Sequence, residues 1–126
     1  MWFKNGQPFY FEAPDGLTGQ KRNFPTNEAQ EKAYAATIAA TIVASTTLIN
    51  LAEMTGDVTL NLTLNAQLEI GDTLVVKSIS DTTARDITLG TGFTGTTIAG
   101  VISKTKVATF FFDGTSFLPI ATIQAD

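Results

Sequence analysis

The sequence GTGFTG at residues 90–95 is the segment whose residue types and spacing come nearest to a chemical motif. It matches the G-x-G-x-x-G pattern of dinucleotide-binding loops, and Asp113 follows at a suitable distance for a ribose-binding carboxylate. That chemistry needs a helix to begin at the third glycine, because the helix N-terminus binds the pyrophosphate. The residues that follow, TTIAGVISKTK, are β-branched and typical of a strand. The pattern therefore predicts a glycine-rich β-turn or bulge.

Carboxylates are the other candidates for chemistry, and they lie at predicted strand ends or turns: Glu53, Asp57, Glu69, Asp72, Asp81, Asp86 and Asp113. Two of them could form a glycosidase pair if their carboxyl groups were about 5 to 10 Å apart. Aspartate in turns commonly accepts hydrogen bonds from its own backbone, and we favour this role. Arg85 is expected to pair with Asp81 or Asp86. No recognised spacing supports a calcium ion between them, so no metal is predicted.

Missing residue types narrow the function further. The chain contains no cysteine and no histidine, which excludes disulfides, thiolate sites and the Ser-His-Asp and Cys-His nucleophiles. Eight basic and 12 acidic residues give a net charge of −4, without a basic patch for nucleic acid or an anionic membrane. The first residues lack a secretory signal and no apolar run has transmembrane length. We expect a soluble, non-enzymatic protein made in a cytoplasm, with no cofactor and with neither nucleic acid nor membrane as a partner.

Alternation of apolar and polar residues dominates the chain from about residue 37 onward. In DVTLNLTL, at residues 57–64, four aliphatic side chains fall on one face of a strand, with hydroxyls and an amide on the other. The sequon Asn61-Leu62-Thr63 lies within this strand and is discounted as a glycosylation site. A strand containing Ile38, Ala40 and Ile42 is expected after a start near Ala36, and further strands are expected near residues 46–53, 57–64, 72–79, 86–89, 96–102, 104–112 and 117–123. This spacing predicts an all-β fold, a small antiparallel β-sandwich of jelly-roll type, over residues 37–126.

Aromatic residues are concentrated in two segments, where they are candidate contacts with another subunit or protein. Residues 1–26 are expected to form an arm with an aromatic hairpin around Asn5-Gly6, carrying Trp2, Phe3, Phe9, Tyr10, Phe11 and Phe24. A hairpin alone is marginal in water, so these rings are candidate attachment or subunit contacts. Phe110, Phe111 and Phe112 place rings on both faces of one strand, followed by a turn at Asp113-Gly114. Phe111 is expected either to meet a second subunit or to cap one end of the fold.

A short helix is expected between the arm and the sandwich, over residues 27–36. Asn27 is a possible N-cap and Gln30 follows three residues later, ahead of the alanine-rich EAQEKAYAA. Beyond Tyr34 the β-branched residues overtake the helix signal, so the change to strand is expected near Ala36.

Four segments, read in order, carry a family resemblance: TLINLAEMTGDVTLNL, IGDTLVVKS, DITLGTGF and KVATFFFDGTSF. With them the chain resembles β-sandwich modules of tailed-bacteriophage virion proteins, which include head fibres, capsid decoration proteins and tail-fibre segments. In many relatives an aromatic residue, often tryptophan, follows the "DGT" turn, and Phe117 stands near that position here.

The resemblance implies a structural protein of the virion, assembled in the bacterial host cytoplasm. It implies a homotrimer that docks onto the major capsid or other virion proteins through the N-terminal arm. Decoration or head-fibre subunit is thus the expected function. The alternative is a carbohydrate-binding or tail-fibre module that recognises a cell-surface glycan, with Trp2, Tyr10 or Tyr34 as stacking platforms. An enzyme with a carboxylate pair is the least favoured reading.

Overall fold

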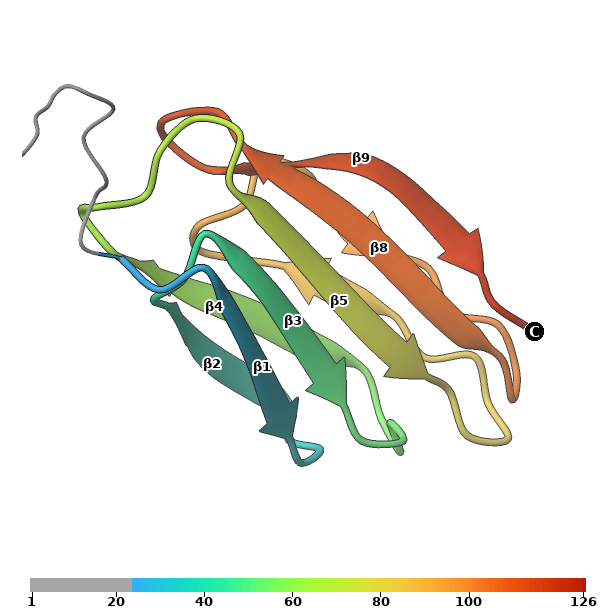
Figure 1. The fold of residues 1–126 in the computed structure, drawn as a ribbon. Coiled ribbons are helices and arrows are strands. Elements are labelled where there is room, and N and C mark those ends of the chain that lie inside the picture. The colour runs from blue at the N-terminus through green and yellow to red at the C-terminus, as the bar shows by residue number, and fades with distance from the viewer. Residues whose placement is uncertain (1–23) are drawn as a thin grey trace, which may run out of the picture.

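The chain folds into two stacked β-sheets (Figure 1). The computed structural model describes residues 24–126, and the part of the expected aromatic arm at residues 1–23 lies outside the described residues. Nine strands and no helix form the described part, which confirms the all-β prediction. The strands are β1 (Asn27–Lys32), β2 (Thr37–Ile42), β3 (Thr46–Leu51), β4 (Val58–Leu64), β5 (Thr73–Ile79), β6 (Ile87–Leu89), β7 (Thr97–Ile98), β8 (Thr105–Phe112) and β9 (Phe117–Gln124).

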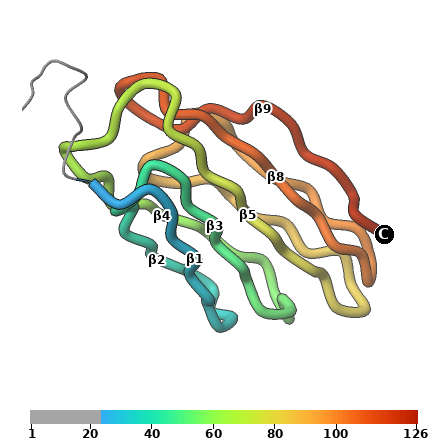
Figure 2. The backbone as a smooth tube through the Cα atoms, in the orientation of Figure 1, coloured from blue at the N-terminus to red at the C-terminus, as the bar shows by residue number. Residues whose placement is uncertain are grey.

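The sheets are mixed, with strand orders β1-β3-β5-β8-β9 and β2-β4-β6-β7. From β1 to β6 the chain passes from one sheet to the other and back, so neighbours within each sheet run parallel (Figure 2). Only from β7 onward are strands added antiparallel, as β6–β7, β5–β8 and β8–β9. The expected antiparallel, jelly-roll-like arrangement is therefore wrong. The alternation along each strand was identified correctly, but alternation places residues on faces and does not set the direction of the neighbouring strand.

The short helix expected over residues 27–36 is replaced by strand β1 and a four-residue connection. β1 pairs with β3 along its whole length, from Asn27 opposite Thr46 to Lys32 opposite Leu51. This pairing satisfies the main-chain groups along one edge of β3, and such tertiary hydrogen bonding outweighs the helix propensity of a short Glu- and Ala-rich segment. The other expected strands are present within about two residues, except that 96–102 contributes only Thr97–Ile98.

The core lies between the two sheets and is built from alternate residues of the strands. Its largest side chains, Phe110 and Phe117, are fully buried. The ring of Phe110 lies 5.0 Å from that of Phe93, and the rings of Phe112 and Phe117 lie 5.3 Å apart. Tilted pairs at such distances are favourable packing arrangements for aromatic rings. Aromatic packing therefore concentrates at the end of the core where β8 turns into β9.

Both lateral ends of the sandwich are closed. At the β1–β2 end, Glu28 and Gln30 lie opposite buried residues of β3, on the core side of the sheet. The Gln30 amide donates to the Thr41 carbonyl of β2 at 2.8 Å and to the Glu28 carboxylate at 2.8 Å, so it bridges the two sheets. At the far end, Phe93 forms a β-bridge with Phe117. Inward-pointing polar and charged side chains on an edge strand oppose the addition of further strands.

Thr47 is a buried residue whose hydroxyl is left without a partner. The residue is 0% exposed, and its Oγ1 is the one buried side-chain polar atom in residues 24–126 found without a hydrogen bond. An unpaired buried hydroxyl carries a desolvation penalty that an apolar group of the same shape does not.

Thr47→Val is therefore expected to raise the free energy of unfolding by about 1 to 2 kcal/mol. Urea titration followed by circular dichroism measures the change. Thr63→Val on the exposed side of β4 is the control and should change stability by less than about 0.5 kcal/mol. A loss of stability in Thr47→Val would mean that the hydroxyl has a partner in solution.

Candidate interaction surfaces

The glycine-rich segment at residues 90–95 forms a turn, as predicted. Gly92 has a φ of 90° and the next element is strand β7 rather than a helix. The amide of Leu62 donates to the Thr91 carbonyl at 2.8 Å, and the amide of Phe117 donates to the Gly92 carbonyl at 2.9 Å. The turn thus links β4 in one sheet to β9 in the other. Its glycines serve packing, and no helix N-terminus is present to bind a phosphate.

Asp81 and Arg85 form the ion pair that the sequence predicted. Arg85 Nε donates to Asp81 Oδ1 at 2.8 Å and Nη2 donates to Oδ2 at 3.0 Å. The hydrogen bond from Arg85 lowers the pKa of Asp81, and the same bond raises the pKa of Arg85. Asp81 also accepts the amide of Thr83, which fixes the turn between the two residues. Each side chain neutralises the charge of the other, and the pair holds the turn between residues 81 and 85.

Asp113 also holds a turn, as the sequence interpretation favoured, whereas Asp57 joins two segments that are distant in the sequence. Asp57 Oδ1 accepts the amide of Asp86 at 2.9 Å. Asp113 Oδ1 accepts the amides of Ser116 at 2.9 Å and Thr115 at 2.8 Å, and these bonds lower the pKa of Asp113. Within residues 24–126 no group of three or more Asp and Glu side chains is arranged to hold a metal ion. In the same residues no helix has the length and apolarity needed to cross a membrane.

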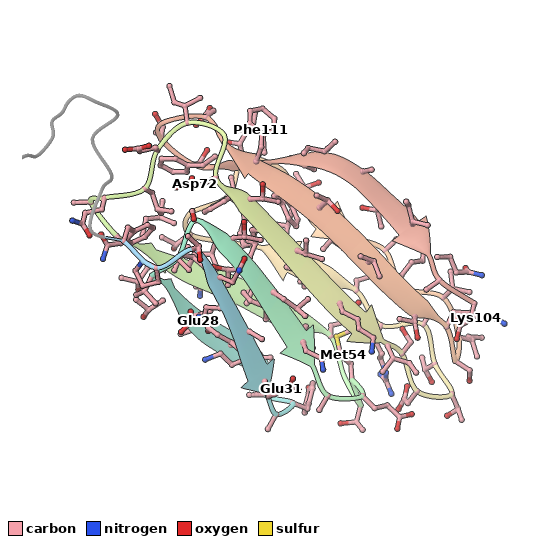
Figure 3. The ribbon with its side chains drawn as sticks, in the orientation of Figure 1. Glu28, Glu31, Met54, Asp72, Lys104 and Phe111 are labelled. Atoms are coloured by element: carbon pink, nitrogen blue, oxygen red, sulfur yellow. The ribbon has the colours of Figure 1, made fainter. Side chains whose placement is uncertain are left out.

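Two of the predicted interface residues can be placed. Phe24 is half-buried and packs against the core of its own subunit. Phe111 lies near the end of β8, is 36% exposed and points away from the core, unlike its neighbours Phe110 and Phe112 (Figure 3). The remaining predicted contacts lie outside the described residues: Trp2, Phe3, Phe9, Tyr10 and Phe11. Phe111 therefore belongs to an outward surface, and an end-capping role in the core does not fit its position.

The outer side of the five-stranded sheet is rich in apolar side chains, and we call it the aliphatic face. Its register aligns Leu48 with Val75, then Val75 with Thr109 and Thr109 with Ala121, across four adjacent strands. Leu48 is 37% exposed and Ile123 is 63% exposed. The apolar residues at outward positions of this face are Ala29, Leu48, Val75, Ile79, Val107, Phe111, Leu118, Ala121 and Ile123.

The outer side of the four-stranded sheet is lined by threonine, and we call it the threonine face. One row runs across all four strands as Thr37, Thr59, Thr88 and Thr97. Further along, Thr41 lies opposite Thr63. Hydroxyl-bearing side chains of this kind suit a solvated sheet surface. The two outer faces of the sandwich thus differ in composition: the threonine face carries almost only polar side chains, whereas the aliphatic face carries many apolar side chains among threonines and other polar residues.

A hollow of about 310 Å³ lies on the aliphatic face where β1 and β3 meet. Its lining residues are Asn27, Glu28, Ala29, Thr46 and Leu48. Sequence reasoning recognised the strands and the hydroxyl-bearing side of residues 57–64, but it missed the aliphatic face and the hollow. Alternation alone could have separated aliphatic from threonine residues within a strand, yet combining strands into faces requires the order of strands in each sheet.

No protein-family model matches the chain, and no curated protein matches it by sequence. Functional inference therefore rests on the surfaces described above and on the pattern of the sequence.

Proposed function

We propose that this chain is a non-enzymatic structural subunit of a phage particle, a capsid decoration or head-fibre protein. It attaches through residues 1–26 and assembles as a homotrimer on the virion. The observation that carries the proposal is the aliphatic face, a broad, nearly uncharged outward surface on a rigid two-sheet body. Apolar surface of this extent on a soluble domain is typical of protein interaction sites.

The junction between the proposed arm and the body supports an attachment role. The Pro25 carbonyl accepts the amide of Ser45 at 2.9 Å, and the Thr26 carbonyl accepts the amide of Thr46 at 2.9 Å. The Ser45 hydroxyl adds a bond to the Thr26 carbonyl at 3.1 Å. The chain is thus fixed to the sandwich immediately before β1. A pull on the arm would be transmitted to the body through these main-chain bonds.

The test uses particles of the phage whose genome encodes this chain. The protein is first removed from the particles, and purified protein is then added back. The full-length chain is expected to rebind, and the triple variant Trp2→Ala, Phe9→Ala, Phe11→Ala should bind at least about tenfold more weakly, because aromatic anchors dominate interface energies. Co-sedimentation with the particles measures the binding. Tyr34→Ala removes an aromatic ring from the body and should bind like the wild type. Undiminished rebinding by the triple variant would refute attachment through the arm.

Glycan recognition is the alternative, and the described residue that favours it is Tyr34. Its ring lies in the β1–β2 connection, is 37% exposed, and has its hydroxyl beside Gly56. Sugar rings stack on exposed aromatic faces, so a glycan array should detect this activity. Array binding that is lost in Tyr34→Ala, together with no rebinding of the full-length chain to particles, would replace the proposed function by this alternative.

A further inference from the structure

We propose that the aliphatic face is the surface through which copies of this chain pack against one another. A contact that uses the same face on both copies joins them in pairs by two-fold symmetry, so it is separate from the three-fold contact of the proposed homotrimer and takes only its biological setting from the proposed function. The occupant of the face is a second copy of the same chain, placed sheet against sheet. Several independent properties of the face favour such a partner.

The contrast between the two outer faces is the first argument. The outward positions of β2 and β4 carry threonines, Asn61 and one apolar residue, Ala39, whereas those of the five-stranded sheet carry aliphatic and aromatic side chains interspersed with threonines. A sheet with one solvated face carries polar residues on that face. The threonine face follows this rule, and the aliphatic face departs from it at the apolar positions given above. The aliphatic face therefore has the residue pattern of a covered surface.

Charge is the second argument, because it selects the kind of partner. The outward positions of the five strands carry two charged residues, Glu31 on β1 and Lys77 on β5, in one row with Asn50 between them. Glu31 already accepts a hydrogen bond from the Asn50 amide at 2.9 Å. A face with one positive and one negative side chain has no net positive charge to attract a polyanion such as nucleic acid. It can meet a copy of itself without an excess of like charge.

Shape is the third argument. The face carries a projection and a depression of its own: Phe111 stands out beside Leu118 on β8 and β9, and the hollow lies between β1 and β3. These features lie toward opposite edges of the same face, with β5 between β3 and β8. A second copy offers a matching projection for the hollow. An interface that uses the same patch on every copy requires this kind of self-complementarity.

Area is the fourth argument. Five strands spaced about 4.8 Å apart and about 7 residues long cover a flat area of roughly 550 Å². Two such faces in contact would bury about twice that area, which exceeds the roughly 1,000 Å² expected of a specific interface. The β1 edge is a poorer contact, since Glu28 and Gln30 point inward there and oppose added strands. The face is the larger and better suited surface.

The experiment compares two threonines of the full-length chain that occupy equivalent positions on opposite faces. Thr109 on β8 and Thr59 on β4 are both half-buried, point outward and lie on interior strands. Thr109→Glu places a carboxylate in the middle of the aliphatic face, and Thr59→Glu places one in the threonine face. Light scattering over a roughly hundredfold range of concentration gives the association constant of each variant. Circular dichroism verifies that both are folded.

The wild type is expected to self-associate, with at least about tenfold weaker association in Thr109→Glu and unchanged association in Thr59→Glu. A wild type that stays monomeric throughout overturns the proposal, and so does equal weakening by both substitutions. Rebinding to phage particles is measured separately, so that failure of self-association and failure of the proposed function are told apart.

A second measurement tests the proposal even if one of the glutamate variants does not fold. Because the chain lacks cysteine, Thr109→Cys and Thr59→Cys each introduce a unique thiol. A short bismaleimide is expected to join copies of Thr109→Cys and to leave Thr59→Cys uncrosslinked. The reverse pattern, or equal crosslinking, contradicts the assignment of the face.

Discussion

Phe110→Ala is expected to lower the free energy of unfolding by about 3 to 5 kcal/mol, one of the largest effects of any single substitution in this chain. Phe110 is 0% exposed, and its ring contacts that of Phe93 with 5.0 Å between centroids. Truncation removes the apolar contacts of the ring and leaves a cavity between two sheets that are hydrogen-bonded on both sides and cannot close over it. Urea titration followed by circular dichroism measures the loss.

Phe111→Ala is the matched control, because the same residue type is truncated one position further along the same strand. Its side chain points outward, so the expected change is within about 1 kcal/mol. Both variants must be compared at one protein concentration, since self-association adds a concentration-dependent term to stability. Equal losses in the two variants would show that the sides of β8 are assigned incorrectly.

Gly92→Ala is expected to cost about 2 to 4 kcal/mol, the second large effect. Two penalties combine at this position. The backbone has a φ of 90°, which side chains other than glycine rarely adopt, and an added Cβ would lie 2.7 Å from the Cβ of Leu62, a buried residue of β4. The overlap cannot be relieved by rotating a flexible side chain, because it involves the first carbon of Leu62. Thermal and urea unfolding measure the cost.

Gly71→Ala separates the two penalties. Gly71 has a similar φ of 96°, but an added Cβ there meets nothing within 4 Å. It should therefore show the backbone term alone, about 1 to 2 kcal/mol. If Gly92→Ala were no more destabilising than Gly71→Ala, the close approach of the turn to β4 would not exist in solution. The comparison also tests whether the GTGFTG segment owes its glycines to packing rather than to a ligand.

The strands of this fold are largely predictable from sequence because each carries its own local signal. In β4 the alternation of Val58, Leu60 and Leu62 with polar residues fixes both the strand and its buried face. The turn before β9 is likewise local, since Asp113 binds the amides of the residues that follow it. Such signals depend on residues a few positions apart, and sequence reasoning detects them.

Strand direction and partner choice are not local, and there the prediction failed. A strand that alternates Thr and Ile has the same sequence pattern whether its neighbour runs parallel or antiparallel. β1 shows the same limit: its residues favour a helix, yet main-chain hydrogen bonds to β3, a strand 19 residues further along the sequence, decide its conformation. The local pattern predicts that Phe111 lies on the opposite side of its strand from Phe110 and Phe112. The face that surrounds Phe111 is assembled from β1, β3, β5, β8 and β9, and no single segment contains it.

The passage of consecutive strands between two sheets has a consequence for how such a body can grow. Each complete circuit of the chain, such as β1 with β2 or β3 with β4, adds one parallel strand to each sheet. An inserted circuit would widen both outer faces by about 4.8 Å without altering the closed ends. The width of the sandwich can therefore change in steps of one strand per sheet, while the aliphatic face and the threonine face keep their positions on opposite sides.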